Sequence, residues 1–245
     1  MTTRTDRGGA HAKAVPRWTA NLTVHGVGPP PRPMDDGERG VWITVEQLEG
    51  LLDATVGRPD VVVTFDDGNL SDLEIALPRL LERGLVGRFF VPAGLLGEPG
   101  RLDRAGVREL HGAGMLVGSH GWAHRDWRTL GRGPRGDTEI EEELVRPRQL
   151  LGRITGTTVS EVALPFGSYD RHVLAALRRT GAARVYTSDG GWARPGAWLQ
   201  ARTSIHADAA PTWARELLAR RPGRRTRARS VVVRAAKRGR GSPRG

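Results

Sequence analysis

Residues 61–68 read VVVTFDDG, and this stretch decides the fold class. A continuous run of β-branched and aromatic residues is typical of a strand that is buried on both faces. Such strands occur in parallel sheets that are covered by helices. The stretch therefore predicts an α/β protein in which two adjacent carboxylates, Asp66 and Asp67, follow the end of a central strand.

Strands and helices alternate along the rest of the chain. Apolar runs predict further strands at 21–24, 86–91, 115–117, 159–164 and 184–187. Helical spacing of apolar residues predicts helices at 45–52 (with Thr44 as N-cap), 71–83, 103–111, 138–151 and 171–180, and the Pro-rich residues 28–40 predict a loop. This alternation predicts a parallel sheet, closed as a barrel or open and doubly wound. In both arrangements ligands bind at the carboxyl ends of the strands.

The composition is that of one globular domain without cysteine chemistry. The chain has 245 residues, of which 38% are apolar, and no Cys. This apolar fraction argues against disorder throughout, and we expect one domain of roughly 200 residues. Without Cys the chain has no disulfide, thiol nucleophile or thiolate zinc ligand, so any metal would be bound by His, Asp or Glu.

The positive charge is concentrated at one end of the chain. Of the 38 Lys and Arg residues, 11 lie in residues 220–245, which contain no Asp or Glu, and the other 27 balance 27 acidic residues. We expect a flexible segment at 1–18, a domain at 19–219 and a disordered, Arg-rich tail at 220–245. The neutral domain argues against nucleic acid as its partner, whereas the tail could contact an anionic surface.

Two features bear on location. No apolar run is long enough to cross a membrane, and residues 1–20 lack the apolar stretch of a signal peptide. We therefore expect a cytoplasmic protein. The sequence carries no signal for its oligomeric state.

The carboxylate pair after the central strand has two interpretations. Like charges side by side are costly unless a cation or a shared proton relieves them, which points to a bound cation at Asp66 and Asp67. The alternative is an Asx turn in which Gly68 supplies a positive φ.

A histidine pair follows another predicted strand, in the sequence SHGWAH at residues 119–124. At a spacing of i, i+4, His120 and His124 would lie on one face of a helical turn, close enough to bind one metal ion. A solvated pair without metal is the alternative.

A third polar cluster, LPFGSYD at residues 164–170, turns from a strand into a helix. It has the composition of a Pro/Gly turn with Ser168 or Asp170 as the helix N-cap. Its main-chain N–H groups would also be available to an oxyanion.

The three clusters, in this order, resemble the polysaccharide deacetylase family, also called the NodB homology domain or carbohydrate esterase family 4. TFDDG at 64–68 matches the first family motif at every position, and SHGWAH matches the second, S-H-G-x-x-H. A specified string of five residues arises by chance in about one in ten thousand chains of this length. The resemblance covers roughly residues 20–205.

The resemblance implies a distorted (β/α)7 barrel that hydrolyses the acetamide of an N-acetylated sugar or polysaccharide precursor, or less often an O-acetyl ester. By motif position, Asp66 is the general base, and Asp67, His120 and His124 bind a divalent metal, usually zinc. The main-chain N–H of Phe166 would stabilise the oxyanion. A metal with these ligands keeps positions open for water and for the acetyl oxygen, which agrees with the residue chemistry.

The chain departs from the family pattern at three places. The Arg of the third motif, which in the family orients the base, is replaced by Ala163, so either the activity is reduced or another Arg takes its role. SDGGW at 188–192 matches the fourth motif only loosely, and the late catalytic His has its candidate in His206. His25, after the first strand, is a second candidate at the mouth of the site. The alternative function is that of a degenerate member that binds metal and carbohydrate with little or no catalysis.

Overall fold

A computed structural model describes residues 16–220 and Lys237. Its main sheet has nine strands, with the order β10-β8-β7-β6-β5-β4-β1-β11 and with β9 paired to β1. All neighbours are parallel except β9 and β1. The strands are β1 (Thr19–Val24), β4 (Val61–Phe65), β5 (Arg88–Val91), β6 (Leu116–Ser119), β7 (Glu161–Ala163), β8 (Arg184–Thr187), β9 (Trp192–Ala193), β10 (Leu199–Ala201) and β11 (Thr203–Ser204).

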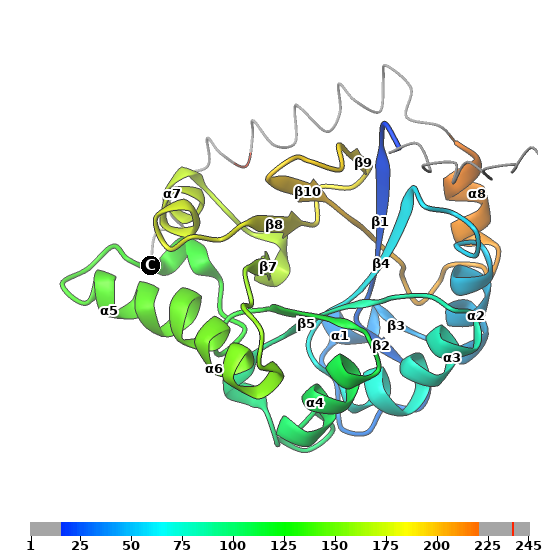
Figure 1. Cartoon of the computed structure of the whole chain (residues 1–245), viewed down its shortest axis with the longest axis horizontal. Helices are drawn as coiled ribbons and strands as arrows, with labels where there is room; N and C mark the ends of the chain where they lie inside the picture. Colours follow the sequence, from blue (N-terminus) through cyan, green and yellow to red (C-terminus); the bar gives the residue numbers. More distant parts are fainter. Residues whose placement is uncertain (1–15, 221–236, 238–245) are drawn as a thin grey trace, which may run out of the picture.

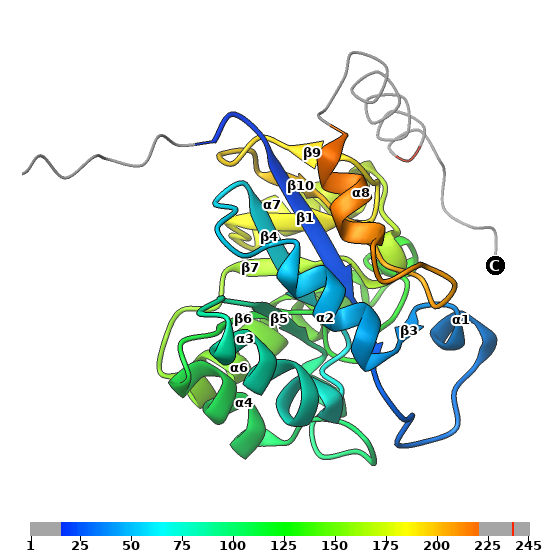
Figure 2. The same cartoon turned by 90° about the vertical axis from the view of Figure 1, so that its right-hand side faces the viewer.

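The sheet curves into a nearly closed barrel with the helices around its outside (Figure 1). These helices are α2 (Val45–Asp53), α3 (Leu77–Glu82), α4 (Arg104–Gly112), α5 (Gly136–Ile140), α6 (Arg146–Thr155) and α7 (Arg171–Arg179). A final helix, α8 (Trp213–Ala219), packs beside α2 (Figure 2). The predicted α/β class and the barrel are thereby confirmed. Within the described part of the chain, no helix is long and apolar enough to cross a membrane.

The central strand forms as its sequence predicts. Along β4, Val63, Thr64 and Phe65 are buried, and the ring of Phe65 stacks on Phe89 of β5 with centroids 4.6 Å apart. Other strands also carry polar side chains within them. Asn21 of β1 donates to Oε1 of Gln200 in β10, and Arg88 of β5 forms an ion pair with Glu161 of β7.

Two predicted helices, 71–83 and 138–151, are not continuous α-helices. Each contains a five-residue π-helical segment, Asp72–Ala76 and Glu141–Val145, directly before α3 and α6. In both helices a proline, Pro78 or Pro147, stands at the start of the following α-helix. Because proline has no N–H to donate, the helix takes one wide turn at this point and then resumes α geometry.

The predicted loop at 28–40 is wrong in one part. Asp36–Arg39 forms a short helix, α1, because the side chain of Asp35 accepts the N–H of Glu38 and caps its first turn. The chain on either side of it forms a small parallel sheet of β2 (Gly26–Val27) and β3 (Trp42–Ile43). These elements place α1 over the carboxyl end of the barrel.

The predicted domain boundaries, 19 and 219, remain a prediction. The segments 1–15, 221–236 and 238–245 lie outside the described residues. The predictions of a flexible N-terminal segment and a disordered tail therefore remain predictions.

Candidate active site

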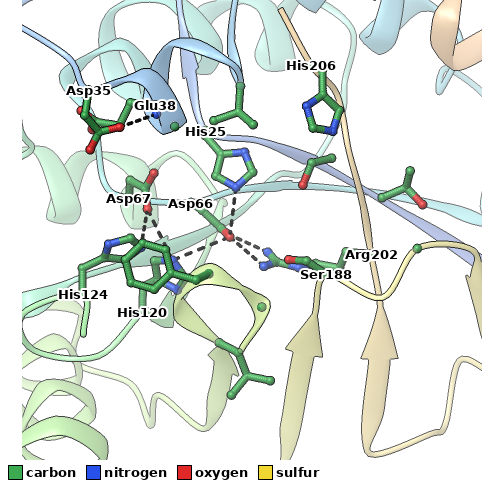
Figure 3. Close-up of a pocket in the computed structure, with 18 of the residues that line it drawn as sticks. His25, Asp35, Glu38, Asp66, Asp67, His120, His124, Ser188, Arg202 and His206 are labelled. Atoms are coloured by element: carbon green, nitrogen blue, oxygen red, sulfur yellow. Dashed lines mark hydrogen bonds and ion pairs between the residues drawn. The ribbon is translucent and has the colours of Figure 1, made fainter. Parts of the chain in front are cut away.

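The polar residues singled out in the sequence meet at the carboxyl ends of the parallel strands. His25 follows β1, Asp66 and Asp67 follow β4, and His120 follows β6. Phe166 follows β7, and His206 comes two residues after β11. All of them line one cavity of about 740 Å³ (Figure 3). Parallel strands bring residues far apart in the sequence to one edge of the sheet, as predicted.

Asp67, His120 and His124 converge on a single point. The Nε2 atoms of His120 and His124 lie 3.4 and 3.3 Å from Oδ1 of Asp67. The three candidate ligand atoms lie within 4.8 Å of one another. The predicted helical turn between the histidines is wrong, since residues 120–124 form a loop in which Gly121 and His124 have positive φ. The loop nevertheless brings both imidazoles to the same carboxylate.

The tautomer of His120 is set by the main chain. Its Nδ1 donates a hydrogen bond of 3.0 Å to the carbonyl of Ala163, so Nε2 is the ring nitrogen that faces Asp67. Burial alone would lower the pKa of His120, but the carboxylates of Asp66 and Asp67 outweigh it and raise that pKa. Burial, followed by the neighbouring His120, lowers the pKa of His124 to about 4. His124 is therefore a neutral imidazole at pH 7.

These three residues fit a divalent cation. Oδ1 of Asp67 is buried and has no hydrogen-bond donor at normal geometry among the described residues. Burial would raise the pKa of the Asp67 carboxyl group, but the three neighbouring histidines outweigh this effect and hold the pKa below its usual range. One carboxylate oxygen and two imidazole nitrogens form a donor set that zinc and several other divalent metals accept, with positions left open.

Asp66 has an arginine partner in Arg202, although the third motif provides none. It follows β10, is 1% exposed, and donates to both oxygens of Asp66, with Nη1 to Oδ1 at 2.6 Å and Nη2 to Oδ2 at 2.7 Å (Figure 3). Burial would raise the pKa of Asp66, but Arg202 and then His120 lower it below its ordinary value. Asp66 is thus an oriented, ionised carboxylate. Sequence reasoning left the position of such an Arg open.

The backbone is strained where the site is built. Only three non-glycine residues of the described chain have a positive φ, and all belong to the site: Asp67, His124 and Phe166. Aspartate and histidine tolerate this region, but a bulky residue such as Phe166, at φ 56°, is an outlier. Its exposed ring lies over His124, with centroids 4.5 Å apart. Strain of this kind persists where the surroundings impose it and is typical of active sites.

Gly167 fixes the turn that carries Phe166, and its replacement by Ala tests this. Its φ is +59°, and an added Cβ would lie 2.6 Å from Cβ of Ser188. We expect Gly167→Ala to lose about 1–2 kcal/mol of unfolding free energy to the left-handed backbone and about 1–3 kcal/mol more to the clash. Denaturant unfolding would measure both.

The matched control is Gly156→Ala. Gly156 has φ +72° but nothing within 4 Å of an added Cβ, so it isolates the cost of the backbone conformation. Equal losses in the two variants would show that Ser188 does not hold the turn.

A buried glutamate holds the histidine loop. Oε2 of Glu143, a residue 3% exposed, accepts the main-chain N–H of Trp122 at 3.0 Å and that of Ala123 at 3.5 Å. It also accepts the indole N–H of Trp127 at 3.4 Å. Both main-chain donors lie between the two histidines. This role cannot be predicted from the sequence, because Glu143 is one of a run of glutamates near the start of a predicted helix.

His206, the candidate acid, and His25, the histidine at the mouth of the site, occupy different positions. Nε2 of His25 lies 4.0 Å from Oδ2 of Asp66, and burial lowers the pKa of His25. His206 is exposed and also lines the cavity. In Figure 3 it lies beyond His25 as seen from the histidine pair His120 and His124. Both belong to the site by position, and the role of each remains a prediction.

Fold and site together define a β/α-barrel protein with an enzyme-like centre at the carboxyl ends of its strands. The chain belongs to the polysaccharide deacetylase family, whose family model matches residues 53–185. A Bacillus subtilis (strain 168) protein named for this family, YxkH, is 24% identical over 131 residues. That match covers 54% of this chain and 45% of YxkH, so the chain spans less than half the length of this curated relative.

Solved structures share the fold. A polysaccharide deacetylase of Bacillus cereus, BC0361, superposes with a TM-score of 0.70 at 18% identity, over 82% of this chain and 69% of that one. The Streptococcus pyogenes deacetylase PplD, solved in complex with acetate, gives 0.67 at 18% identity over 82% and 97%. IcaB of Ammonifex degensii gives 0.66 at 24% identity over 81% and 97%.

Proposed function

We propose that the chain is a metal-dependent hydrolase that removes acetyl groups from N-acetylated sugars or polysaccharide precursors. The observation that carries the proposal is that two adjacent aspartates in one cavity have different partners. Asp67 faces two imidazole nitrogens, whereas Asp66 is held ionised by Arg202. Membership of the polysaccharide deacetylase family supports the substrate class.

Asp67, His120 and His124 would hold the metal, for which zinc fits the donor set. When bound, the metal supplies a Lewis acid that lowers the pKa of a water molecule and polarises the acetyl carbonyl. The hydrogen bond from His120 to Ala163 keeps the Nε2 lone pair free for this role.

The other residues move protons and stabilise charge. Asp66, ionised at neutral pH, would accept the proton of the attacking water. The main-chain N–H of Phe166, at the strained turn, would donate to the oxygen that becomes negative as water adds to the carbonyl. His206, on the exposed side of the cavity, would donate a proton to the departing amine nitrogen. Acetate and a free amino group are the products.

Acetate release from a panel of N-acetylated and O-acetylated sugars and oligosaccharides tests the proposal. Acetate release from the N-acetylated members would show that an amide bond is hydrolysed. The oligosaccharide length that reacts fastest would indicate the length of the substrate. Metal bound without acetate release from any member would favour the alternative, a degenerate relative that binds carbohydrate.

Glu143→Ala is expected to weaken metal binding. Removing the carboxylate leaves the N–H groups of Trp122 and Ala123 without their acceptor, so the histidine loop loses its fixed position. We expect zinc affinity to fall by about 10- to 100-fold, the usual effect of losing a residue that supports metal ligands. Calorimetric titration of metal-stripped protein would measure it.

The neighbouring Glu141→Ala is the matched control, because Glu141 is exposed on the same helical segment. Unchanged zinc affinity in Glu143→Ala would exclude the role of Glu143 in holding the loop.

A further inference from the structure

An arginine outside the family motifs contacts the loop that carries Asp67. Arg101 lies between β5 and α4, and its side chain, 14% exposed, lines the cavity. Its Nη1 donates hydrogen bonds of 2.8 Å to the main-chain carbonyl of Asp67 and of 3.0 Å to Oδ1 of Asn69. Hydrogen bonds from a charged donor are stronger than those from a neutral one. Arg101 therefore binds the chain at Asp67 itself and again two residues later.

The main chain fixes the base of the Arg101 side chain. Two main-chain hydrogen bonds of 2.9 Å join residues 100–102 to residues 68–70, so that Arg101 and Asn69 are partners in an antiparallel bridge. Asn69 is 1% exposed, and its Nδ2 donates to the carbonyl of His25 at the end of β1. The guanidinium group therefore reaches the loop after β4 from a fixed position.

Asp67 needs such an anchor because of its backbone conformation. Its φ is 73°, and that of the next residue, Gly68, is 59°. An aspartate tolerates the left-handed region but does not prefer it, so its surroundings must hold it there. The Nε2 atoms of the two histidines lie 3.4 and 3.3 Å from Oδ1 of Asp67. A rotation of the main chain at Asp67 would carry this oxygen away from them.

The ion pair with Glu38 does not explain the position of Arg101. Nη2 of Arg101 lies 3.6 Å from Oε1 of Glu38, which is beyond hydrogen-bond distance. Arg32 already donates to both carboxylate oxygens of Glu38, at 2.9 and 2.5 Å. Figure 3 shows Glu38 on the same side of the cavity as Asp67, away from Arg202. The hydrogen bonds of Arg101 thus go to the loop of Asp67, and Glu38 adds only attraction.

We propose that Arg101 is a positioning residue for the metal. It holds the main chain of Asp67 in the conformation that directs Oδ1 at the two histidines, with Asn69 as its second point of attachment. The inference rests on the proposed function, in which Asp67, His120 and His124 are the metal ligands.

Zinc titration of metal-stripped protein tests this role. Methionine has a length similar to that of arginine but no donor, and residues that support metal ligands typically change metal affinity by about 10- to 100-fold. We expect a loss of about this size in Arg101→Met. If Arg101 acted only through its charge, its removal would tighten zinc binding, because like charges repel. Unchanged or tighter zinc binding in Arg101→Met would overturn the proposal.

Arg32→Met is the matched control. The Arg32 side chain also lines the cavity, is 19% exposed, and is attracted by the carboxylate of Asp67, as Arg101 is. It donates to Pro33 and Glu38 rather than to the loop of Asp67. We expect Arg32→Met to bind zinc as the natural chain does. A loss equal to that of Arg101→Met would trace the effect to the ion pairs of Glu38 and contradict the role of Arg101.

The visible absorption of bound Co²⁺ is the second readout, because it depends on the arrangement of the metal ligands. At saturating cobalt we expect an altered spectrum in Arg101→Met and the natural spectrum in Arg32→Met. Arg101→Lys, which keeps a charged donor, should regain part of the zinc affinity. Should Arg101→Met fail to fold, Asn69→Ala removes the second attachment and should weaken zinc binding severalfold. Natural affinity and a natural spectrum in a folded Asn69→Ala would then overturn the proposal.

These measurements separate the inference from the proposed function, because neither depends on acetate release. Normal acetate release together with unchanged zinc binding in Arg101→Met would contradict only the role of Arg101. A natural chain that binds zinc through Asp67 but releases no acetate would contradict only the deacetylase activity. A natural chain that binds no zinc would contradict both.

Discussion

We expect Asp66→Asn to lower the rate of acetate release by about 10²- to 10⁴-fold, the range typical for the loss of a general base. The amide keeps the shape of the carboxylate but cannot accept the proton of the attacking water. Metal content should stay the same, because the proposed ligands are Asp67 and the two histidines. Acetate assays on protein of measured metal content would check both statements.

Asp72→Asn is the matched control for this prediction. Asp72 is also a buried aspartate, but burial, with Asp67 and Asp66 nearby, raises its pKa well above the ordinary value. The raised pKa favours the neutral carboxyl group, which Asn closely resembles. We expect near-normal activity from Asp72→Asn. Full activity in Asp66→Asn would contradict the assignment of Asp66 as the base.

Arg202→Met is expected to alter both stability and pH dependence. Removing one partner of a buried ion pair typically costs about 3–5 kcal/mol, because the remaining charge has no compensation. In the natural chain the pKa of Asp66 lies below its ordinary value. Asp66 therefore stabilises the fold at any pH above the pKa that this carboxyl group has in the unfolded chain. The stabilisation is lost as the pH falls through the pKa of Asp66 in the folded chain.

Without Arg202, we expect the shift in the pKa of Asp66 to change direction. Burial then has less opposition and raises the pKa of Asp66, so the base is protonated at a higher pH and the acid limb of the pH–rate profile moves upward. Denaturant unfolding and a pH–rate profile would measure the two effects. An unchanged profile in Arg202→Met would show that Arg202 does not orient or ionise the base.

Two further variants separate the roles of Arg202. Arg148→Met removes another buried arginine, whose hydrogen bonds go to the carbonyls of Leu144 and Thr180, and should lower stability without moving the pH profile. The double variant Asp66→Asn/Arg202→Met should regain stability relative to Arg202→Met, since no uncompensated carboxylate is left. It should remain inactive.

The meeting of the motif residues in one cavity could be predicted from the sequence because these residues are local. Asp66, Asp67, His120 and His124 lie in short motifs at the ends of strands, and a parallel sheet brings those ends together whatever the details of the helices. The histidine loop shows the limit of this reasoning. The i, i+4 spacing suggested a helical turn, but the positive φ of Gly121 and His124 gives a different path to the same meeting point.

Arg202 could not be found in this way. It is one of 36 arginines, so an arginine at one position carries little information. It also follows β10, a strand of only three residues that the hydrophobic pattern does not reveal. The ion pair with Asp66 depends on tertiary packing between residues 136 positions apart.

The positions of the two π-helical segments could be predicted in part from the sequence. Pro78 and Pro147 both stand inside the stretches predicted as continuous helices, and a proline there removes a donor from the helix. Both π-helical segments precede these prolines, and one of them carries Glu143. The two prolines therefore indicate an irregularity in each helix, although they do not indicate the contact that Glu143 makes with the histidine loop.

The most direct test of the account is acetate release by one protein sample before metal removal, after metal removal and after zinc is added back, with the bound metal counted at each stage. We predict release from an N-acetylated oligosaccharide that disappears with the metal and returns with about one zinc per chain. Release that continues in metal-free protein would contradict the proposed mechanism, and a chain that binds no metal would contradict the assignment of Asp67, His120 and His124.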